Sequence, residues 1–178
     1  MRKLSVLVAL SAAMAAPSAA QSEEIRARLI GYQEVPSVST VASGEFEGQI
    51  NRNEDAIDYE LTFSGLQGTV TQSHIHFGQR SVAGSIVIWL CGTGTTQPLA
   101  GPPGTQTCPQ SGTIHGTITA ANVVAASMTS QQIVAGELGE VIAAIRAGVA
   151  YANVHTNLST GGEIRGQLRA SHRDKDRD

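Results

Sequence analysis

The sequence feature that most constrains the fold is a strict alternation of apolar and polar residues over Ile57–Phe63. Every second residue there is large and apolar, and each residue between is polar or charged. A period of two is typical of a β-strand with one face in a core and the other in water. The alternation recurs over Ile25–Ile30, Gly44–Ile50 and Thr113–Thr119. Because sheets with one wet face are typically antiparallel, the chain predicts an antiparallel, all-β domain.

Other segments complete this prediction. Thr71–Gly78 has the character of a strand, and Val149–Thr156 with Glu163–Arg169 predicts a hairpin. Ile86–Leu90 is apolar on both faces, which predicts a central strand buried between layers. Apolar residues spaced i, i+3, i+4, i+7 predict one short helix over Glu137–Ala147. About eight strands and one short helix indicate an antiparallel β-sandwich or flattened barrel.

The two ends of the chain differ from this domain. A basic start, an apolar run over Leu4–Ala16 and the small residues Ser18–Ala20 predict a secretory signal peptide over residues 1–20. The apolar run is too short to span a bilayer comfortably, and no long apolar segment follows it, so no transmembrane segment is expected after cleavage. The domain is expected over residues 21–170, followed by a charged, disordered tail over residues 171–178. The predicted location is the periplasm or the exterior of the cell.

Cys91 and Cys108 are the two cysteines of the chain. In an oxidising compartment such a pair is expected to form a disulfide, here across a loop rich in Gly, Thr and Pro. A metal-binding or redox thiol pair is the alternative, but the spacing is not that of a C-x-x-C motif.

The charge balance argues against one class of partner. The formal net charge is −3 and aromatic residues make up 4% of the chain. This leaves no basic footprint for nucleic acid and few rings for stacking on bases. The chain also lacks the G-x-S-x-G and G-x-x-x-x-G-K-[ST] motifs of serine hydrolases and phosphate-binding loops.

Histidines form the most informative constellation. His74 and His76 stand two residues apart on an expected strand, so both project from one face. His155 lies on another expected strand, and His115 on a third offers a fourth ligand. Zinc and copper bind neutral imidazole, and their sites usually have three or four ligands. We therefore predict a copper or zinc site, with Glu163 as a ligand or as a group that orients an imidazole.

Simpler interpretations stay open for the same residues. The histidines can be polar groups at a sheet edge that bond to backbone or threonine. Glu163 and Arg165 share a strand face, so an ion pair between them is the simpler expectation.

Five short motifs follow one another along the chain: Leu29-x-Gly31-x-Gln33-Glu34-Val35-Pro36, Ser64-Gly65-Leu66, His74-Ile75-His76, Tyr151-x-Asn153-Val154-His155-Thr156 and Gly162-Glu163-Ile164-Arg165-Gly166-Gln167-Leu168. In this order they resemble the CHRD domain, the module first named from chordin. The resemblance covers about Ile25 to Leu168 and implies an all-β fold of immunoglobulin-like or barrel type. Bacterial members of the family are similar exported single-domain proteins, and the resemblance implies no particular reaction.

Two segments depart from the pattern of that family. Phe77–Arg80 follows the histidine pair where many members have Gly-Pro, and Gly92–Gly112 enlarges a loop that is short elsewhere. The loop surface near the histidines is therefore not carried over from the family.

Residues His74–Gly78 also resemble, loosely, the first copper-ligand strand of copper/zinc superoxide dismutase, another antiparallel sandwich. In that family a bridging histidine joins copper to zinc and an arginine steers the anion. The chain shows neither a histidine-rich zinc loop nor a matching C-terminal arginine motif.

Three functions follow from these observations. The first is a non-catalytic exported binding module for a protein partner or a metal ion. The second is a copper- or zinc-dependent enzyme of superoxide-dismutase-like type, which needs an open coordination position. The third is a structural surface protein. Because no catalytic constellation is evident, the sequence favours the first and assigns no catalytic residue.

Overall fold

The computed structural model of the chain describes residues 22–94 and 99–172. The strands are β1 (Glu23–Ile30), β2 (Ser43–Ile50), β3 (Ala56–Ser64), β4 (Val70–Phe77), β5 (Ser85–Gly92), β6 (Gly112–Thr119), β7 (Ala150–Thr156), β8 (Ile164–Gln167) and β9 (Arg169–His172). One α-helix, α1 (Leu138–Arg146), and three short 3₁₀ turns at Gly31–Gln33, Ala120–Asn122 and Thr129–Gln131 complete the elements. Among the described residues no helix is long and apolar enough to cross a membrane.

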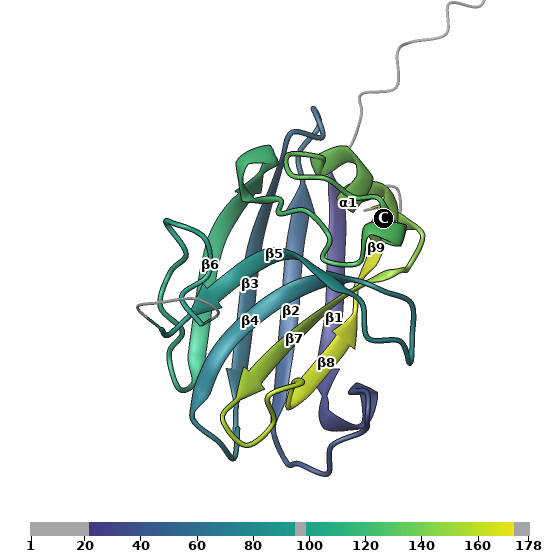
Figure 1. Ribbon diagram of the computed structural model, residues 1–178. Coiled ribbons are helices and arrows are strands. Elements are labelled where there is room, and N and C mark those ends of the chain that lie inside the picture. The colour runs from purple at the N-terminus through teal and green to yellow at the C-terminus, as the bar shows by residue number, and fades with distance from the viewer. Residues whose placement is uncertain (1–21, 95–98, 173–178) are drawn as a thin grey trace, which may run out of the picture.

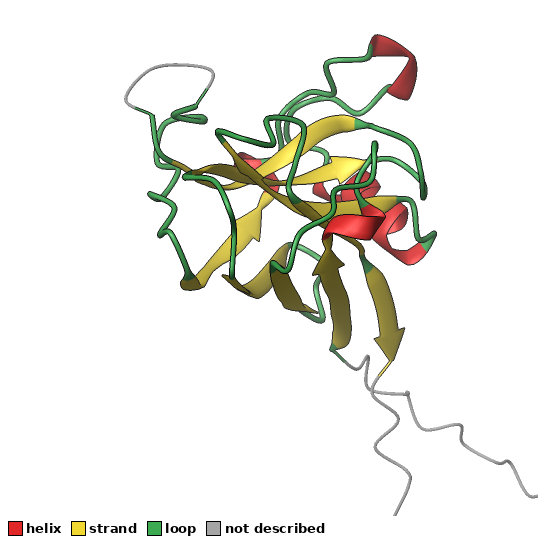
Figure 2. Ribbon diagram, turned by 90° about the horizontal axis from the view of Figure 1, so that it is seen from below, coloured by secondary structure: helices red, strands yellow, loops and turns green. Residues whose placement is uncertain are grey.

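The nine strands form one antiparallel sheet that curls into a nearly closed barrel. The strand order is β5-β4-β7-β8-β1-β2-β3-β6, and β9 also pairs with β1. Figure 1 shows β4, β5, β7 and β8 crossing in front of β1, β2 and β3, and Figure 2 shows the two layers from below. The prediction of an all-β, antiparallel sandwich or flattened barrel with one short helix is confirmed.

The strand β5 differs from its prediction. The segment Ile86–Leu90 was expected at the centre of a sheet, but β5 stands at one end of the strand order. Ile88 and Leu90 are nevertheless buried. The outer edge of β5 is covered by a short segment that forms a bridge between Val123 and Ile88, and Val124 N donates to Val87 O. The outer edge of β5 is therefore covered by an irregular segment rather than by another strand, while Ile86 and Trp89 are only half-buried.

The helix α1 caps one end of the barrel. Its apolar positions Leu138, Val141, Ile142 and Ile145 are buried in the core with Phe46. Glu140 lies in its first turn and Arg146 in its last, which suits the helix dipole. Arg146 contacts Glu23 and Glu54, each at 2.7 Å. These ion pairs tie the end of the helix to β1 and to the turn between β2 and β3.

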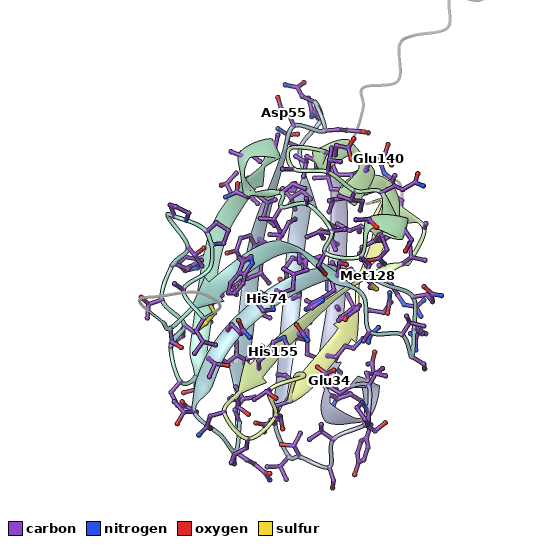
Figure 3. All side chains as sticks on the ribbon, viewed as in Figure 1. Glu34, Asp55, His74, Met128, Glu140 and His155 are labelled. Atoms are coloured by element: carbon purple, nitrogen blue, oxygen red, sulfur yellow. A yellow bond between two sulfur atoms is a disulfide. The ribbon has the colours of Figure 1, made fainter. Side chains whose placement is uncertain are left out.

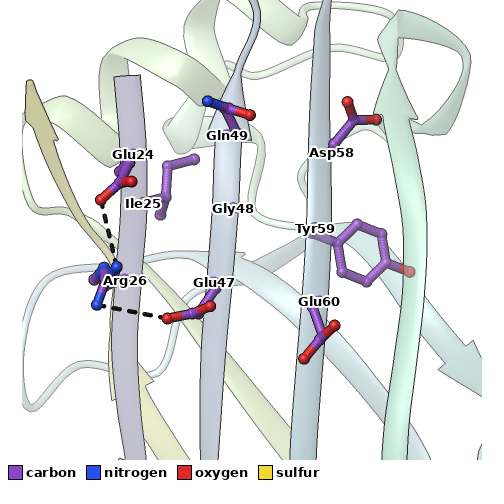
Figure 4. Close-up of a pocket in the computed structure, with 9 residues that line it drawn as sticks. All are labelled: Glu24, Ile25, Arg26, Glu47, Gly48, Gln49, Asp58, Tyr59 and Glu60. Atoms are coloured by element: carbon purple, nitrogen blue, oxygen red, sulfur yellow. Dashed lines mark ion pairs between the residues drawn. The ribbon is translucent and has the colours of Figure 1, made fainter. Parts of the chain in front are cut away.

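The outer face of β1, β2 and β3 is charged. Arg26 forms ion pairs with Glu24 and Glu47 at 3.5 Å, beside a shallow pocket of about 310 Å³ that Asp58 and Glu60 also line (Figure 4). The alternation over Ile57–Phe63 places its apolar residues in the core and its acidic residues here. This wet face matches the single-sided pattern in the sequence.

The two ends of the chain fall partly outside the described residues. The expected signal over residues 1–20 and the tail from residue 173 onward lie there. Ser171 and His172, expected in the disordered tail, instead form the end of β9, where they pair with Glu24 and Glu23 of β1. After β8, the hairpin partner of β7, the chain continues in a second short strand, β9, which pairs with β1.

Candidate metal centre

Two neighbouring strands place three histidines on one face of the sheet. In the antiparallel pair β4–β7, His74 lies opposite Asn153, and Gln72 lies opposite His155. The alternate residue Ile75 points to the other face and joins the hydrophobic core. The histidines therefore occupy the face that is turned away from the barrel interior, and Figure 3 shows His74 and His155 side by side there.

The three imidazoles converge. One ligating nitrogen from each of His74, His76 and His155 lies within 4.8 Å of the others. His74 Nδ1 is 3.2 Å from His155 Nε2. The rings of His74 and His155 meet edge to face, with centroids 4.9 Å apart. Sequence reasoning placed these residues on separate strands, and the β4–β7 pairing brings them together.

Two backbone carbonyls set the tautomers of two of these rings. His76 Nδ1 lies 2.9 Å from Gly84 O, and His155 Nδ1 lies 2.9 Å from Thr160 O. A carbonyl only accepts, so in each neutral ring the proton is on Nδ1 and Nε2 carries a lone pair. His76 Nε2 is buried and has no hydrogen-bond partner among the described residues. The Nε2 lone pairs of His76 and His155 therefore lie close together in the enclosed space between the three rings.

Burial keeps all three imidazoles neutral. It lowers the pKa of His76 to about 4, although the Gly84 carbonyl acts in the opposite direction. Burial also lowers the pKa of His155, and it lowers the pKa of His74 well below its usual value, with repulsion from the other two rings as a further cause. Neutral imidazole is the form that binds metal ions, so the site is ready for a cation at neutral pH.

Aromatic side chains hold the rings in place. Tyr151 stacks on His76 with centroids 4.7 Å apart, and Trp89 meets His74 edge to face at 4.2 Å. The guanidinium of Arg165 lies over the Tyr151 ring, 3.4 Å from its centroid. Such a stack restricts the ring rotations that would separate the imidazoles.

Loops close the site from solvent. Arg165 donates to the carbonyls of Gln79 and Val82, which ties the loop between β4 and β5 over the cluster. His74, His76 and His155 are only 0%, 7% and 5% exposed. The cluster is therefore enclosed, and a ligand in it would be cut off from bulk water.

The remaining predicted residues lie elsewhere. His115 is an exposed residue of β6 opposite Glu60 and is not part of the histidine cluster. Cys91 and Cys108 form the predicted disulfide, with Cys91 opposite Ser73, one residue before His74. The bridge fixes the loop after β5 beside the strand that carries Trp89.

The expected ion pair between Glu163 and Arg165 is wrong. Glu163 instead accepts hydrogen bonds from Thr40, Thr156 and the backbone N–H groups of Gln67 and Gly68. Arg165 turns toward the Tyr151 ring. Glu163 is thus neither beside an imidazole nor beside the guanidinium.

Two residues of the site were missed. Asn153 is 1% exposed, and its Oδ1 lies 3.0 Å from His155 Nε2. Glu34 is 5% exposed and approaches Asn153. Burial raises the pKa of Glu34 to about 7, although the Val35 N–H, the charge of Arg165 and the Asn153 side chain each act to lower it. The position of Asn153, two residues before His155 on a strand, was a signal that it shares that face. In the sequence, Glu34 is linked to this site only by its place in the first of the five ordered motifs.

The donor set suits a transition-metal ion. Metal–nitrogen bonds of 2.0–2.1 Å in a tetrahedral site separate neighbouring ligand atoms by about 3.3 Å. The 3.2 Å between His74 Nδ1 and His155 Nε2 is close to that value. The unpartnered Nε2 of His76 is a further free electron pair. Soft or borderline ions such as zinc and copper match imidazole donors better than magnesium or calcium does.

The fold and this cluster define a class: an antiparallel β-barrel-like domain with three buried histidines on one outer face. A search of curated proteins and a search of solved structures give no significant match. The family model of the CHRD domain matches residues 25–168, which is most of the chain. The chain therefore belongs to the CHRD domain family.

Proposed function

We propose that this protein is an exported CHRD-domain binding module that holds one copper or zinc ion between His74, His76 and His155. The observation that carries the proposal is the unpartnered lone pair of His76 Nε2, buried beside two further imidazole nitrogens. Burying a polar atom without a partner costs about 1–3 kcal/mol. A bound cation would remove that cost and use all three imidazoles.

The enclosure of the site favours a binding role over catalysis. Catalytic zinc sites keep a coordination position open to water or substrate, whereas structural sites are closed. The described residues around the three rings leave them almost fully buried. The predicted signal peptide and the disulfide both support export to an oxidising compartment.

Metal analysis of the full-length protein tests this proposal. The protein is expressed without a polyhistidine tag, exported, purified, incubated with Zn²⁺ or Cu²⁺ and desalted. Mass spectrometry should then find one ion per chain, and His74→Ala should reduce this to less than a tenth while circular dichroism stays unchanged. His115→Ala removes an exposed histidine outside the cluster and should keep the full stoichiometry.

No retained ion in the wild-type protein would overturn the proposal. Equal loss in His115→Ala and His74→Ala would also overturn it, because it would assign the ion to the surface. Superoxide consumption by the copper-loaded protein separates a binder from an enzyme of superoxide-dismutase-like type, and we expect none above that of free copper.

A further inference from the structure

Asn153 presents an oxygen to the same interior space as the histidines. Its Oδ1 lies 3.0 Å from His155 Nε2, and its amide also approaches His76. Because Thr160 O holds the proton of His155 on Nδ1, its Nε2 is an acceptor. Two acceptor atoms this close repel each other unless a positive centre lies between them. The arrangement therefore points to a shared cation.

The orientation of this amide has a physical cause. Asn153 Nδ2 and Glu34 Oε1 both lie beside Gly162, and the Asn153 side chain acts to lower the pKa of Glu34, while Oε1 itself is buried and has no hydrogen-bond partner among the described residues. Val35 N donates to the other carboxyl oxygen, Oε2, at 3.3 Å. A carboxylate accepts and an amide NH₂ group donates, so this contact favours the rotamer in which Oδ1 faces the imidazoles.

Gly162 makes the contact between Glu34 and Asn153 fit. A Cβ atom on Gly162 would overlap Glu34 Oε1 and would lie 2.9 Å from Asn153 Nδ2. Its φ of +125° is also one that other residues rarely adopt. Glu34, which is distant in the sequence, thus meets Asn153 and Gly162 of the β7–β8 hairpin around one amide group.

From this geometry we propose that Asn153 Oδ1 is the fourth ligand of the metal ion and that Glu34 is the positioning residue that aims it. The inference rests on the proposed function of the three-histidine site. It makes the site a closed set of three nitrogens and one oxygen. All four ligands are neutral, and the buried carboxyl group of Glu34 lies beside Asn153 rather than among them. Four protein ligands in a closed shell are typical of a structural zinc site.

The test measures Zn²⁺ affinity by competition with a chelator, and Cu²⁺ coordination by electron paramagnetic resonance. Asn153→Leu has nearly the same shape and lacks the oxygen; we expect at least tenfold weaker binding and a changed copper spectrum. Loss of outer partners of metal ligands typically costs 10–100-fold in affinity, so Glu34→Gln should weaken binding about tenfold.

A double variant that exchanges the carboxyl and amide groups of Glu34 and Asn153 distinguishes loss of the ligand from misfolding. In the double variant E34Q/N153D, the introduced glutamine amide donates to the introduced aspartate carboxylate, and an oxygen still faces the imidazoles. We expect this variant to bind Zn²⁺ at least as tightly as the wild type and tenfold or more better than Glu34→Gln alone. His115→Ala is the matched control and should match the wild type in both measurements.

The outcomes separate this inference from the proposed function. If the wild type retains no metal, both fail. If the wild type binds one ion but Asn153→Leu shows the same affinity and the same copper spectrum, the three-histidine site stands and the Asn153 ligand is wrong. If Asn153→Leu weakens binding while E34Q/N153D stays as weak as Glu34→Gln, the positioning role of Glu34 is wrong.

Discussion

Replacing Glu163 by glutamine should destabilise the fold by an amount that depends on pH. The side chain is 1% exposed, and it accepts four hydrogen bonds. Thr40 Oγ1 and Gln67 N donate to Oε1 at 2.9 and 2.8 Å, and Thr156 Oγ1 and Gly68 N donate to Oε2 at 2.9 and 3.4 Å. Glu163 therefore joins the segment before β2, the turn before β4 and the end of β7.

The magnitude follows from these donors. In Glu163→Gln one oxygen becomes an NH₂ group, and it fits best in place of Oε2, where the Thr156 hydroxyl can rotate to accept. The Gly68 N–H is then left without its acceptor, and the other bonds lose the contribution of the charge. Hydrogen bonds to a charged group contribute about 1.5–3 kcal/mol each, so a total loss of about 2 kcal/mol at pH 7 is expected.

The pH dependence has a definite sign. Burial raises the pKa of Glu163, but the hydrogen bonds from Gln67, Thr156, Thr40 and Gly68 outweigh it, so that the pKa is lowered from its usual value. A lowered folded pKa adds stability above the unfolded pKa of about 4.3, and this stability is lost as the pH falls through the folded value.

Urea unfolding of the wild type and of Glu163→Gln at pH 7 and near pH 3 measures this effect. The difference in the free energy of unfolding between the two proteins should be about 2 kcal/mol at pH 7 and should shrink at the lower pH. A difference near zero at pH 7, or one that grows in acid, would refute the role assigned to the carboxylate.

Three further changes test the core, the disulfide and the histidine cluster. Cys91→Ala with Cys108→Ala should reduce the free energy of unfolding by about 3 kcal/mol, and the melting temperature by about 6–12 °C in a thermal scan; an unchanged scan would contradict it. Ile145→Ala leaves a cavity at a residue 1% exposed and should cost about 2–5 kcal/mol in urea unfolding; a loss below that range would show that α1 is not packed as described. In Glu34→Gln, which removes the carboxyl group whose pKa is about 7, Zn²⁺ affinity should stay constant from pH 8 to pH 6 in chelator competition, since the pKa of His76 is about 4; a steep fall below pH 7 in that variant would indicate exposed imidazoles with their ordinary pKa values.

The architecture followed from periodicity because alternation is a local property. Ile57–Phe63 and the helix over Leu138–Arg146 lie where their patterns predicted, with the helix one residue shorter at each end. The position of β5 did not follow, since an apolar run records burial but not what provides it. Val123 covers that strand from an irregular segment that carries no period.

The histidine cluster was predictable only in part. His74 and His76 share a face by strand geometry, and the pairing of β4 with β7 supplies His155. The groups that set ring orientation come from loops: Gly84 O from one and Thr160 O from another. Backbone carbonyls have no residue signature, so their contribution is visible only once the chain is folded.

The contact of Glu34 with Asn153 has the same character. The two residues are far apart in the sequence, and Gly162 makes room between them. Arg165 shows the limit of same-face reasoning: its strand neighbour Glu163 shares its side of the alternation, but the guanidinium finds the Tyr151 ring and two loop carbonyls instead. Arg165 therefore contacts groups from other parts of the chain rather than its charged neighbour in the sequence.

X-ray absorption at the zinc edge of the loaded, untagged protein tests the central claim most directly, because it counts the imidazoles around the ion. Three imidazoles should be found, with metal–nitrogen distances of about 2.0–2.1 Å, and His74→Ala should abolish the spectrum. A first shell with fewer than three imidazoles, or one dominated by carboxylate oxygens as expected beside His115 and Glu60 on the outer face, would contradict a metal centre at His74, His76 and His155.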